Sequence, residues 1–218
     1  MRFVFFDNRY LRSRDEEILS TLVHTFGLGV SCAMTAALYW LGSQISSTHT
    51  FAGLAYGIAH IVTYAASVAY HYASWPPLKT RLRTVDQATI YTAIAGTYTP
   101  VLLLGLPEAW GISLTVVSWT ACLCGIIYKT SNWQHPEWGS MATYITFAAL
   151  GMLLFVLYDT GPIADSRNVF CLSTAFFSVG LVFYVWHYRP YFHTAWHVMT
   201  VLGHITHFYA VWTCFMKV

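Results

Sequence analysis

The chain has 218 residues, of which 56% are hydrophobic and only 9% are charged. Soluble domains carry about 25% charged residues, so this composition excludes an ordinary water-soluble protein. The formal net charge of +2 says little about partners, and we expect no nucleic acid among them. The five cysteines fall in or beside apolar stretches without zinc-finger spacing, so we expect them to act as small hydrophobic residues.

Seven apolar stretches approach the ~20 residues that a helix needs to cross a bilayer. Short segments containing proline or glycine separate most of them. We predict an all-α integral membrane protein, a seven-transmembrane helix bundle, in which residues 1–17 form a tail and residues 18–218 form the transmembrane domain. In chain order the stretches are Ile18–Leu41, Phe51–Tyr72, Thr84–Leu104, Ala109–Tyr128, Trp138–Tyr158, Val169–His187 and Phe192–Phe215.

The tails and connections between the predicted spans lie alternately on the two sides of the membrane, and the basic residues are unevenly distributed between these two sets. One set holds only Arg167 and Lys217. Because lysine and arginine accumulate on the cytosolic side, we predict a multi-pass protein of the plasma (inner) membrane, with the amino terminus in the cytosol and the carboxyl terminus outside. This orientation is the reverse of that of a G-protein-coupled receptor, and the seventh stretch has no lysine for a retinal Schiff base. The basic residues assigned to the cytosol are Arg2, Arg9, Arg12, Arg14, Lys79, Arg81, Arg83, Lys129 and Arg189.

Three histidines and an aspartate fall at one predicted membrane depth. His71 ends the second stretch, His193 and His197 begin the seventh, and Asp86 begins the third. The i, i+4 spacing puts both histidines of the seventh stretch on one helix face, about 6 Å apart along the axis. Two histidines from one helix and a third from another leave a fourth position for water, as in catalytic zinc sites. We therefore predict Zn²⁺ bound by these three histidines, although imidazole ligands would also suit iron, nickel or copper.

Two residues beside the predicted metal site each have two readings. Asp86 is either a functional charge at membrane depth or an acid that favours the start of its helix through the helix dipole. Ser67 lies one turn before His71 on the same face. Its hydroxyl either orients a bound water or ligand, or bonds a carbonyl of its own helix.

Further histidines also leave alternatives open. Glu17 and His24 are seven residues apart and therefore share a helix face. They form either a pair beside the metal site or a mixed-charge helix start with one buried, hydrogen-bonded histidine. The deeper His60, His204 and His207 either line a polar cavity or make hydrogen bonds between helices.

Taken together, these motifs resemble those of the haemolysin III family, the bacterial branch of the progestin and adipoQ receptor proteins. The wider superfamily includes alkaline ceramidases, which are intramembrane zinc amidases. The family has a further motif in the first stretch, an acidic residue followed by asparagine, threonine and histidine. Around Glu16-Glu17 and His24 this chain departs from it, because Ser20 and Val23 stand where asparagine and threonine are common. The matching segments are Ser67-Val-Ala-Tyr-His71, Asp86-Gln-Ala-Thr-Ile90, Ala95-Gly96-Thr97-Tyr98-Thr99-Pro100 and His193-Thr-Ala-Trp-His197.

The resemblance implies a seven-helix bundle with a cytosolic amino terminus. It also implies zinc at the positions of His71, His193 and His197, with a zinc-bound water held by Asp86 and with Ser67 close by. These implications agree with the site that the spacing predicts.

Three functions fit these predictions. The first is an intramembrane zinc-dependent hydrolase of a lipid amide or ester, with zinc-bound water as the nucleophile, Asp86 as general base and Ser67 helping to hold the water. The second is a non-enzymatic sensor or receptor of a lipid or of membrane state, with a structural zinc. In both, the partner is a membrane lipid. The third, a pore-forming haemolysin, is disfavoured because no stretch carries a ring of charges or a broad polar stripe.

Overall fold

Seven α-helices build the protein, and the computed structural model describes residues 12–131, 137–158 and 161–216. No β-strand occurs among these residues, which confirms the predicted all-α class. The helices are α1 (Arg14–Ile45), α2 (Ser47–Tyr72), α3 (Pro76–Gly105), α4 (Glu108–Ser131), α5 (Glu137–Leu157), α6 (Gly161–Val185) and α7 (Phe192–Ala210), which continues as one π-helical turn, η2 (Val211–Phe215).

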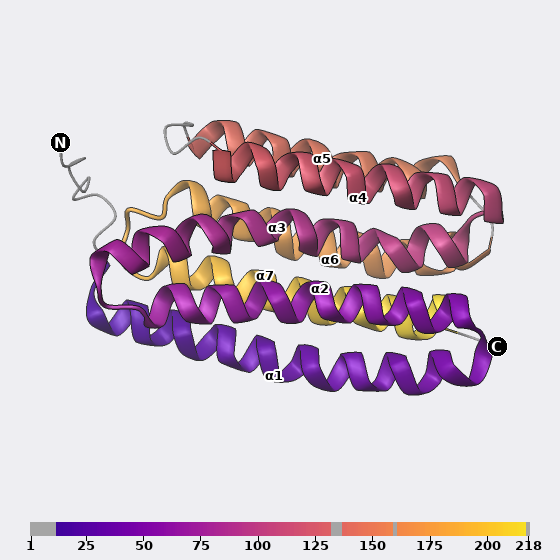
Figure 1. Cartoon of the computed structure of the whole chain (residues 1–218), viewed down its shortest axis with the longest axis horizontal. Coiled ribbons are helices and arrows are strands. Elements are labelled where there is room, and N and C mark those ends of the chain that lie inside the picture. Colours follow the sequence, from indigo (N-terminus) through magenta and orange to yellow (C-terminus); the bar gives the residue numbers. More distant parts are fainter. Residues whose placement is uncertain (1–11, 132–136, 159–160, 217–218) are drawn as a thin grey trace.

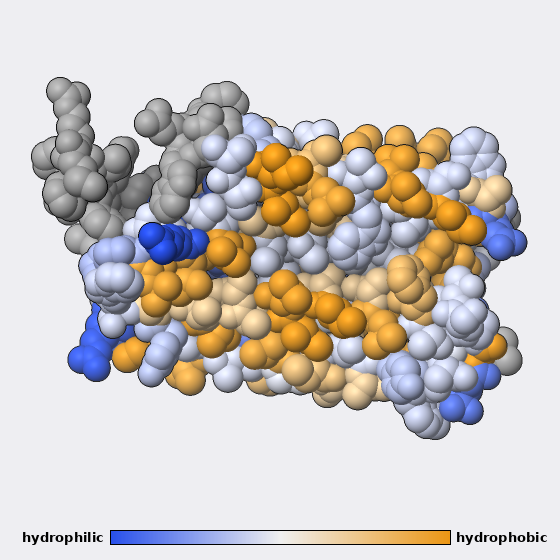
Figure 2. All heavy atoms as spheres, viewed as in Figure 1, coloured by the Kyte–Doolittle hydropathy of each residue, from blue (hydrophilic) through white to orange (hydrophobic). Residues whose placement is uncertain are grey.

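The helices have the length and surface of membrane spans. Within the described residues, α1 to α4, α6 and α7 with η2 are each long and apolar enough to cross a bilayer. Helix α5 has 21 residues and is about 31 Å long, close to the ~30 Å of a bilayer core. Figure 2 shows hydrophobic residues spread along the middle of the bundle and hydrophilic residues gathered at its ends. These features confirm the predicted seven-helix membrane bundle.

The helices lie side by side in three groups (Figure 1). In this view α4 and α5 lie at the top, α3 and α6 in the middle, and α1, α2 and α7 at the bottom. Helix α2 packs between α1 and α3, while α7 packs against α6 and α1. Successive helices run in opposite directions along the bundle. The start of α1, the end of α2 and the starts of α3 and α7 therefore meet at one end of it.

Close helix crossings bring α1, α2 and α3 together. A Cβ atom added to Gly27 of α1 would lie 2.7 Å from Cε1 of Tyr64 on α2. One added to Gly96 of α3 would lie 2.3 Å from the Cβ atom of Ala59, also on α2. Small residues at membrane helix interfaces allow the backbones to approach in this way. Substituting either glycine would therefore push the neighbouring helix away from α2.

Helix α1 begins earlier than its hydropathy predicts, at Arg14 rather than Ile18. Ser13 caps it by accepting a hydrogen bond from the backbone N–H of Glu16 at 3.2 Å. Acidic residues in the first turn are stabilised by the helix dipole, so this polar turn extends the helix without adding hydropathy. Glu17 is consequently part of α1 and not of a tail.

Helix α3 also begins earlier than predicted, at Pro76 rather than Thr84. Proline suits the first helical turn because its missing N–H would have no intrahelical partner there. The three basic residues that we predicted in a connecting loop, Lys79, Arg81 and Arg83, therefore lie within the first eight residues of α3. A hydropathy pattern cannot show this extension because the added turns are polar.

The predicted orientation across the membrane stays a prediction. Helix α1 starts and η2 ends at opposite ends of the bundle (Figure 1), as an odd number of spans requires. Part of the charge count rests on Arg2, Arg9 and Lys217, which lie outside the described residues. Helix α6 begins at Gly161, before the predicted Val169, so the connection before it is shorter than expected.

Candidate metal centre

Four histidines from three helices meet at one end of the bundle, and we call them the metal-site histidines. His71 is the last residue but one of α2, His193 and His197 lie in the first two turns of α7, and His24 comes from α1. All four are buried, with exposed fractions of 2–6%. The ring nitrogens of three of them, His24, His71 and His197, lie within 4.8 Å of one another. Three buried histidines this close together can hold a metal ion.

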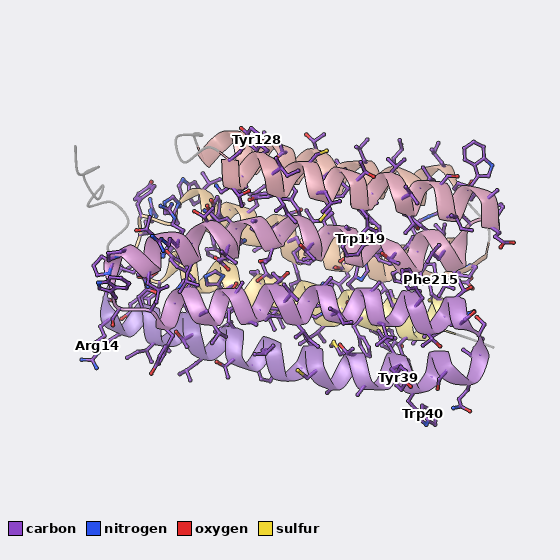
Figure 3. All side chains as sticks on the ribbon, viewed as in Figure 1. Arg14, Tyr39, Trp40, Trp119, Tyr128 and Phe215 are labelled. Atoms are coloured by element: carbon purple, nitrogen blue, oxygen red, sulfur yellow. The ribbon has the colours of Figure 1, made fainter. Side chains whose placement is uncertain are left out.

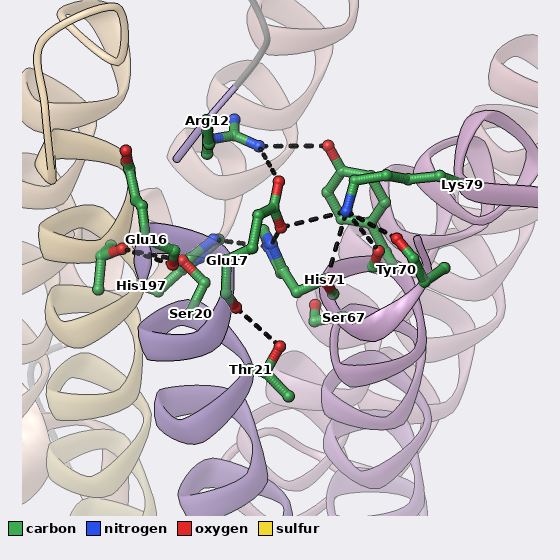
Figure 4. A network of polar contacts seen from close by, with 12 residues as sticks. Arg12, Glu16, Glu17, Ser20, Thr21, Ser67, Tyr70, His71, Lys79 and His197 are labelled. Carbon is green, nitrogen blue, oxygen red and sulfur yellow. Dashed lines mark hydrogen bonds and ion pairs between the residues drawn. The ribbon is translucent and has the colours of Figure 1, made fainter. Parts of the chain in front are cut away.

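His71 of α2 and His197 of α7, two of the three predicted ligands, face each other as predicted. The Nε2 atoms of His71 and His197 are 3.0 Å apart (Figure 4). In a tetrahedral zinc site with Zn–N bonds of ~2.0–2.1 Å, two ligand nitrogens are about 3.3 Å apart. The two rings therefore already point at a common position at almost the separation that one bound ion requires.

His193 lies beside this pair. Its ring centroid is 4.2 Å from that of His197 and 5.4 Å from that of His71. Both ring nitrogens are buried and have no hydrogen-bond partner among the described residues. His193 is not one of the three histidines whose nitrogens lie within 4.8 Å of one another, so its role as a ligand stays a prediction.

His24 is the metal-site histidine that the sequence did not assign to the ion. Its ring centroid lies 4.1 Å from that of His197, and its ring stacks on His71 at 5.5 Å. Both of its nitrogens are buried without a hydrogen-bond partner in the described part of the chain. Glu17 and His24 both lie beside the predicted site, as the first of their two readings requires, with the carboxylate of Glu17 bonded to His71.

Glu17 supports His71 from behind. Its Oε2 atom accepts a hydrogen bond from Nδ1 of His71 at 2.7 Å and lies 3.2 Å from Nζ of Lys79. Arg12 also approaches, with its guanidinium 3.8 Å from Oε1 (Figure 4). A carboxylate on one ring nitrogen of a metal-binding histidine fixes the tautomer and leaves the other nitrogen free for the ion. Glu17 thus directs Nε2 of His71 toward the other metal-site histidines.

Two local features position the helix ends that carry these rings. The ammonium of Lys79 donates to the carbonyl oxygens of Tyr70, His71 and Ala73 at 3.1, 3.4 and 3.2 Å, which caps the end of α2. Helix α7 starts after Tyr191, whose φ of 63° is left-handed. Strained conformations of this kind persist where the surrounding structure requires them, often at functional sites. Here the turn aims the start of α7 back into the bundle.

Ser67 and Asp86 are in direct contact. The Oγ atom of Ser67 donates a hydrogen bond to Oδ1 of Asp86, so the alternative in which Ser67 bonds its own helix is wrong. Asp86 is the eleventh residue of α3, well beyond the first turn in which the helix dipole acts, so the helix-start reading of this acid is also wrong. Ser67 lies one turn before His71 on α2, which places this pair beside that histidine. The structure therefore brings both predicted catalytic residues next to the metal-site histidines.

Comparison with known proteins decides the family. A family model described as haemolysin-III related matches residues 12–208. The chain belongs to the haemolysin III family. It is 28% identical over 201 residues to the hemolysin-3 homolog of Bacillus subtilis (strain 168), which covers 90% of this chain and 92% of that protein. It is also 28% identical over 203 residues to the hemolysin-3 of Bacillus cereus, which covers 90% of each chain. This haemolysin III protein is accordingly a multi-pass protein of the plasma membrane.

This member of the haemolysin III family also has histidines deeper in the bundle, His60, His204 and His207, which we call the deep histidines. The rings of His60 and His204 stack with their centroids 3.8 Å apart and an interplanar angle of 3°. Nδ1 of His60 donates to the carbonyl of Tyr56 at 2.8 Å, and His207 packs edge-on against Phe170 at 4.3 Å. The one hydrogen bond among these contacts stays within α2, so they do not include the predicted hydrogen bonds between helices, and the deep histidines meet neighbouring helices through ring packing.

The metal-site histidines fit a metal ion better than any other described arrangement of ring nitrogens. Nδ1 of His197 and both ring nitrogens of His24 and His193 are buried without a hydrogen-bond partner among the described residues. Leaving such groups unpaired costs about 1–3 kcal/mol each, and a coordinated cation would take up lone pairs that no donor now meets. No second group of three ligand atoms this close occurs in the part of the chain that the structure describes.

Proposed function

We propose that this haemolysin III protein is an intramembrane zinc-dependent hydrolase of a lipid amide or ester. The observation that carries the proposal is the facing pair of buried Nε2 atoms on His71 and His197, 3.0 Å apart, beside the Ser67–Asp86 pair. Neutral imidazoles at this separation, with one ring backed by the carboxylate of Glu17, are the ligands that Zn²⁺ takes in catalytic sites. The predicted third ligand is His193.

Each residue of the site has a distinct part in the proposed reaction. Bound zinc supplies a Lewis acid that lowers the pKa of a coordinated water toward ~7. Asp86 accepts the proton of the attacking water and then gives it to the leaving amine or alcohol as the C–N or C–O bond breaks. Ser67 donates to Oδ1 of Asp86 and so orients the carboxylate that takes that proton. Glu17 keeps His71 in the required tautomer.

A membrane lipid is the substrate that the surroundings of the site favour. Large apolar side chains are exposed over the whole length of the bundle, and Figure 3 shows them projecting outward from the helices. Acyl chains cover such a surface in the bilayer, so a lipid can reach the helix ends by lateral diffusion. The metal-site histidines lie at one end of the bundle, where the polar linkage of a lipid would meet them.

Purified protein in detergent provides the test, with zinc measured by metal analysis and fatty acid release measured on long-chain amides and esters. We expect about one zinc per chain and release of fatty acid. Asp86→Asn should keep the zinc and lower turnover by about 10²–10⁴-fold, because it removes the general base. Asp165→Asn, in the first turns of α6 at the other end of the bundle, is the matched control and should behave as the wild type. Stoichiometric zinc without release from any amide or ester tested would contradict the proposal.

A second candidate function is favoured by one observation, the presence of His24 among the metal-site histidines. Four imidazoles permanently around one ion would leave no position for water, as in structural zinc sites. The protein would then be a non-enzymatic sensor whose helices α1, α2 and α7 are clamped by metal. A lipid that co-purifies and is unchanged by mass spectrometry after long incubation would support this function. Hydrolysed product in the same preparation would exclude it.

A further inference from the structure

We infer that His24 is itself a metal ligand, so that the centre takes imidazoles from three helices and its water position opens only when His24 leaves. The inference rests on the proposed function, since it requires a metal between the metal-site histidines. It adds a ligand on α1 to the three on α2 and α7 that the spacing and the family resemblance predict. It also turns the position of α1 into a determinant of access to the ion.

The first support is the geometry of the ring. The ligand nitrogens of His24, His71 and His197 form the one described group of three within 4.8 Å of one another. The ring of His24 is 4% exposed and lies 4.1 Å from His197 between centroids. Its two nitrogens have no hydrogen-bond partner among the described residues. An imidazole carries one donor and one acceptor when neutral, and a cation shared with the other two rings would occupy the acceptor.

The second support is the set of contacts that hold α1 against α7 at this depth. Ser20, one turn before His24, forms a buried hydrogen bond of 2.9 Å with the hydroxyl of Thr194. Thr194 directly follows His193 and also donates to the backbone carbonyl of Glu16 at 3.4 Å. These contacts put the face of α1 that carries His24 onto the start of α7.

The hydrogen bond that holds the His24 face of α1 against α7 is weak enough to break and re-form. A neutral hydrogen bond such as Ser20–Thr194 contributes about 0.5–1.5 kcal/mol net. His71, in contrast, is held by Glu17, which is itself paired with Lys79. Of His24 and His71, His24 is therefore the ligand that is released more easily. A tetrahedral site with four protein ligands is closed, and one with three accepts water or substrate, so the departure of His24 would open the centre.

Cobalt-substituted full-length protein in detergent tests this inference without relying on activity. We compare the wild type with His24→Cys and with His60→Cys, a matched control that changes a deep histidine of α2. A thiolate bound to cobalt gives a charge-transfer band in the near ultraviolet, which imidazole ligands do not give. We expect this band in His24→Cys and not in His60→Cys. A His24→Cys protein that binds cobalt without the band would overturn the inference.

A second variant tests the opening of the site. His24→Gln should weaken cobalt binding by more than the ~10–100-fold that the loss of a supporting residue costs, as judged by competition with a chelator. Its visible cobalt bands should shift on addition of azide at concentrations that leave the wild-type bands unchanged. Equal affinity and an equal response to azide in wild type and His24→Gln would overturn the role of His24 and leave the hydrolase intact. Wild-type protein that binds neither zinc nor cobalt would overturn both the inference and the proposed function.

Discussion

The metal-site histidines and the deep histidines share helices α2 and α7, but their rings are oriented differently toward one another. In the first set, the Nε2 atoms of His71 and His197 point at each other, and carboxylates lie close by. In the second set, the rings of His60 and His204 stack face to face at 3.8 Å. The nitrogens of these two rings do not belong to any described group of three ligand atoms within 4.8 Å of one another, unlike those of His24, His71 and His197. The number of buried histidines therefore does not define a metal site, whereas the direction of their lone pairs does.

A second difference is the carboxylate that backs the ring. Glu17 bonds Nδ1 of His71, whereas Nδ1 of His60 bonds a backbone carbonyl of its own helix. A carboxylate raises the basicity of the imidazole and is the usual partner of a metal-bound histidine. The comparison thus predicts that substitutions in the metal-site histidines change metal binding, while substitutions in the deep histidines change only helix packing.

The largest expected effect is the loss of metal from His71→Ala. Removing a ligand should reduce zinc affinity by more than the ~10–100-fold that the loss of a supporting residue costs. His204→Ala removes a similarly buried imidazole and should retain one zinc per chain. Metal analysis after dialysis against a chelator measures both. If the two variants lost zinc equally, the distinction between the two sets of histidines would collapse.

The next effect comes from Glu17→Gln, which keeps the size of the side chain but removes its charge. Zinc affinity should fall by about 10–100-fold, because His71 loses the carboxylate that orients it. Glu16→Gln is the matched control, since Glu16 is also buried on α1 but makes no hydrogen bond through Oε1. Chelator competition distinguishes the two. Equal affinities would show that the carboxylate behind His71 has no part in the site.

A smaller effect is expected from Lys79→Met, which removes the cation that caps α2 and contacts Glu17. We expect the free energy of unfolding to fall by about 1 kcal/mol, from a helix cap and a partly exposed ion pair. Arg81→Met changes an exposed basic residue two positions further along α3 and should change stability less. Thermal unfolding in detergent measures both. A stability loss no greater than that of Arg81→Met would show that Lys79 does not hold the end of α2.

The smallest effect concerns the deep histidines. A double-mutant cycle of His60→Phe and His204→Phe should give a coupling energy of about 0.6 kcal/mol, the average for interhelical contacts in membranes. Zinc content should not change in either variant. Unfolding in detergent gives the coupling energy, and metal analysis gives the control. A coupling above ~2 kcal/mol, or a loss of zinc, would contradict a role limited to packing.

Much of the fold could be predicted from the sequence because hydropathy directly encodes membrane spans. The seven stretches correspond to the seven helices, and the shared depth of His71, Asp86 and His197 follows from the direction in which each span runs. The early starts of α1 and α3 could not be predicted in this way. Their first turns are polar, and caps and prolines rather than apolar residues determine where they begin.

The contacts between helices were less predictable than the helices themselves. Helical periodicity assigns His24 and Glu17 to one face of α1 but does not say which helices that face meets. The structure shows that it meets both α2 and α7, so Glu17 reaches His71 and His24 reaches His197. Ser67 illustrates the same point, because its bond to Asp86 depends on how α2 and α3 cross at Gly96 and Ala59.

The length of α3 has a consequence for how a lipid would meet the site. With 30 residues the helix is about 45 Å long, which exceeds the ~30 Å hydrocarbon layer by roughly 15 Å. Asp86 is its eleventh residue, about 15 Å from the start, and so lies near the boundary between acyl chains and headgroups. The amide or ester linkage of a bilayer lipid lies at that same level. The proposed reaction would therefore meet its scissile bond by sideways diffusion alone, without extracting the lipid from its leaflet.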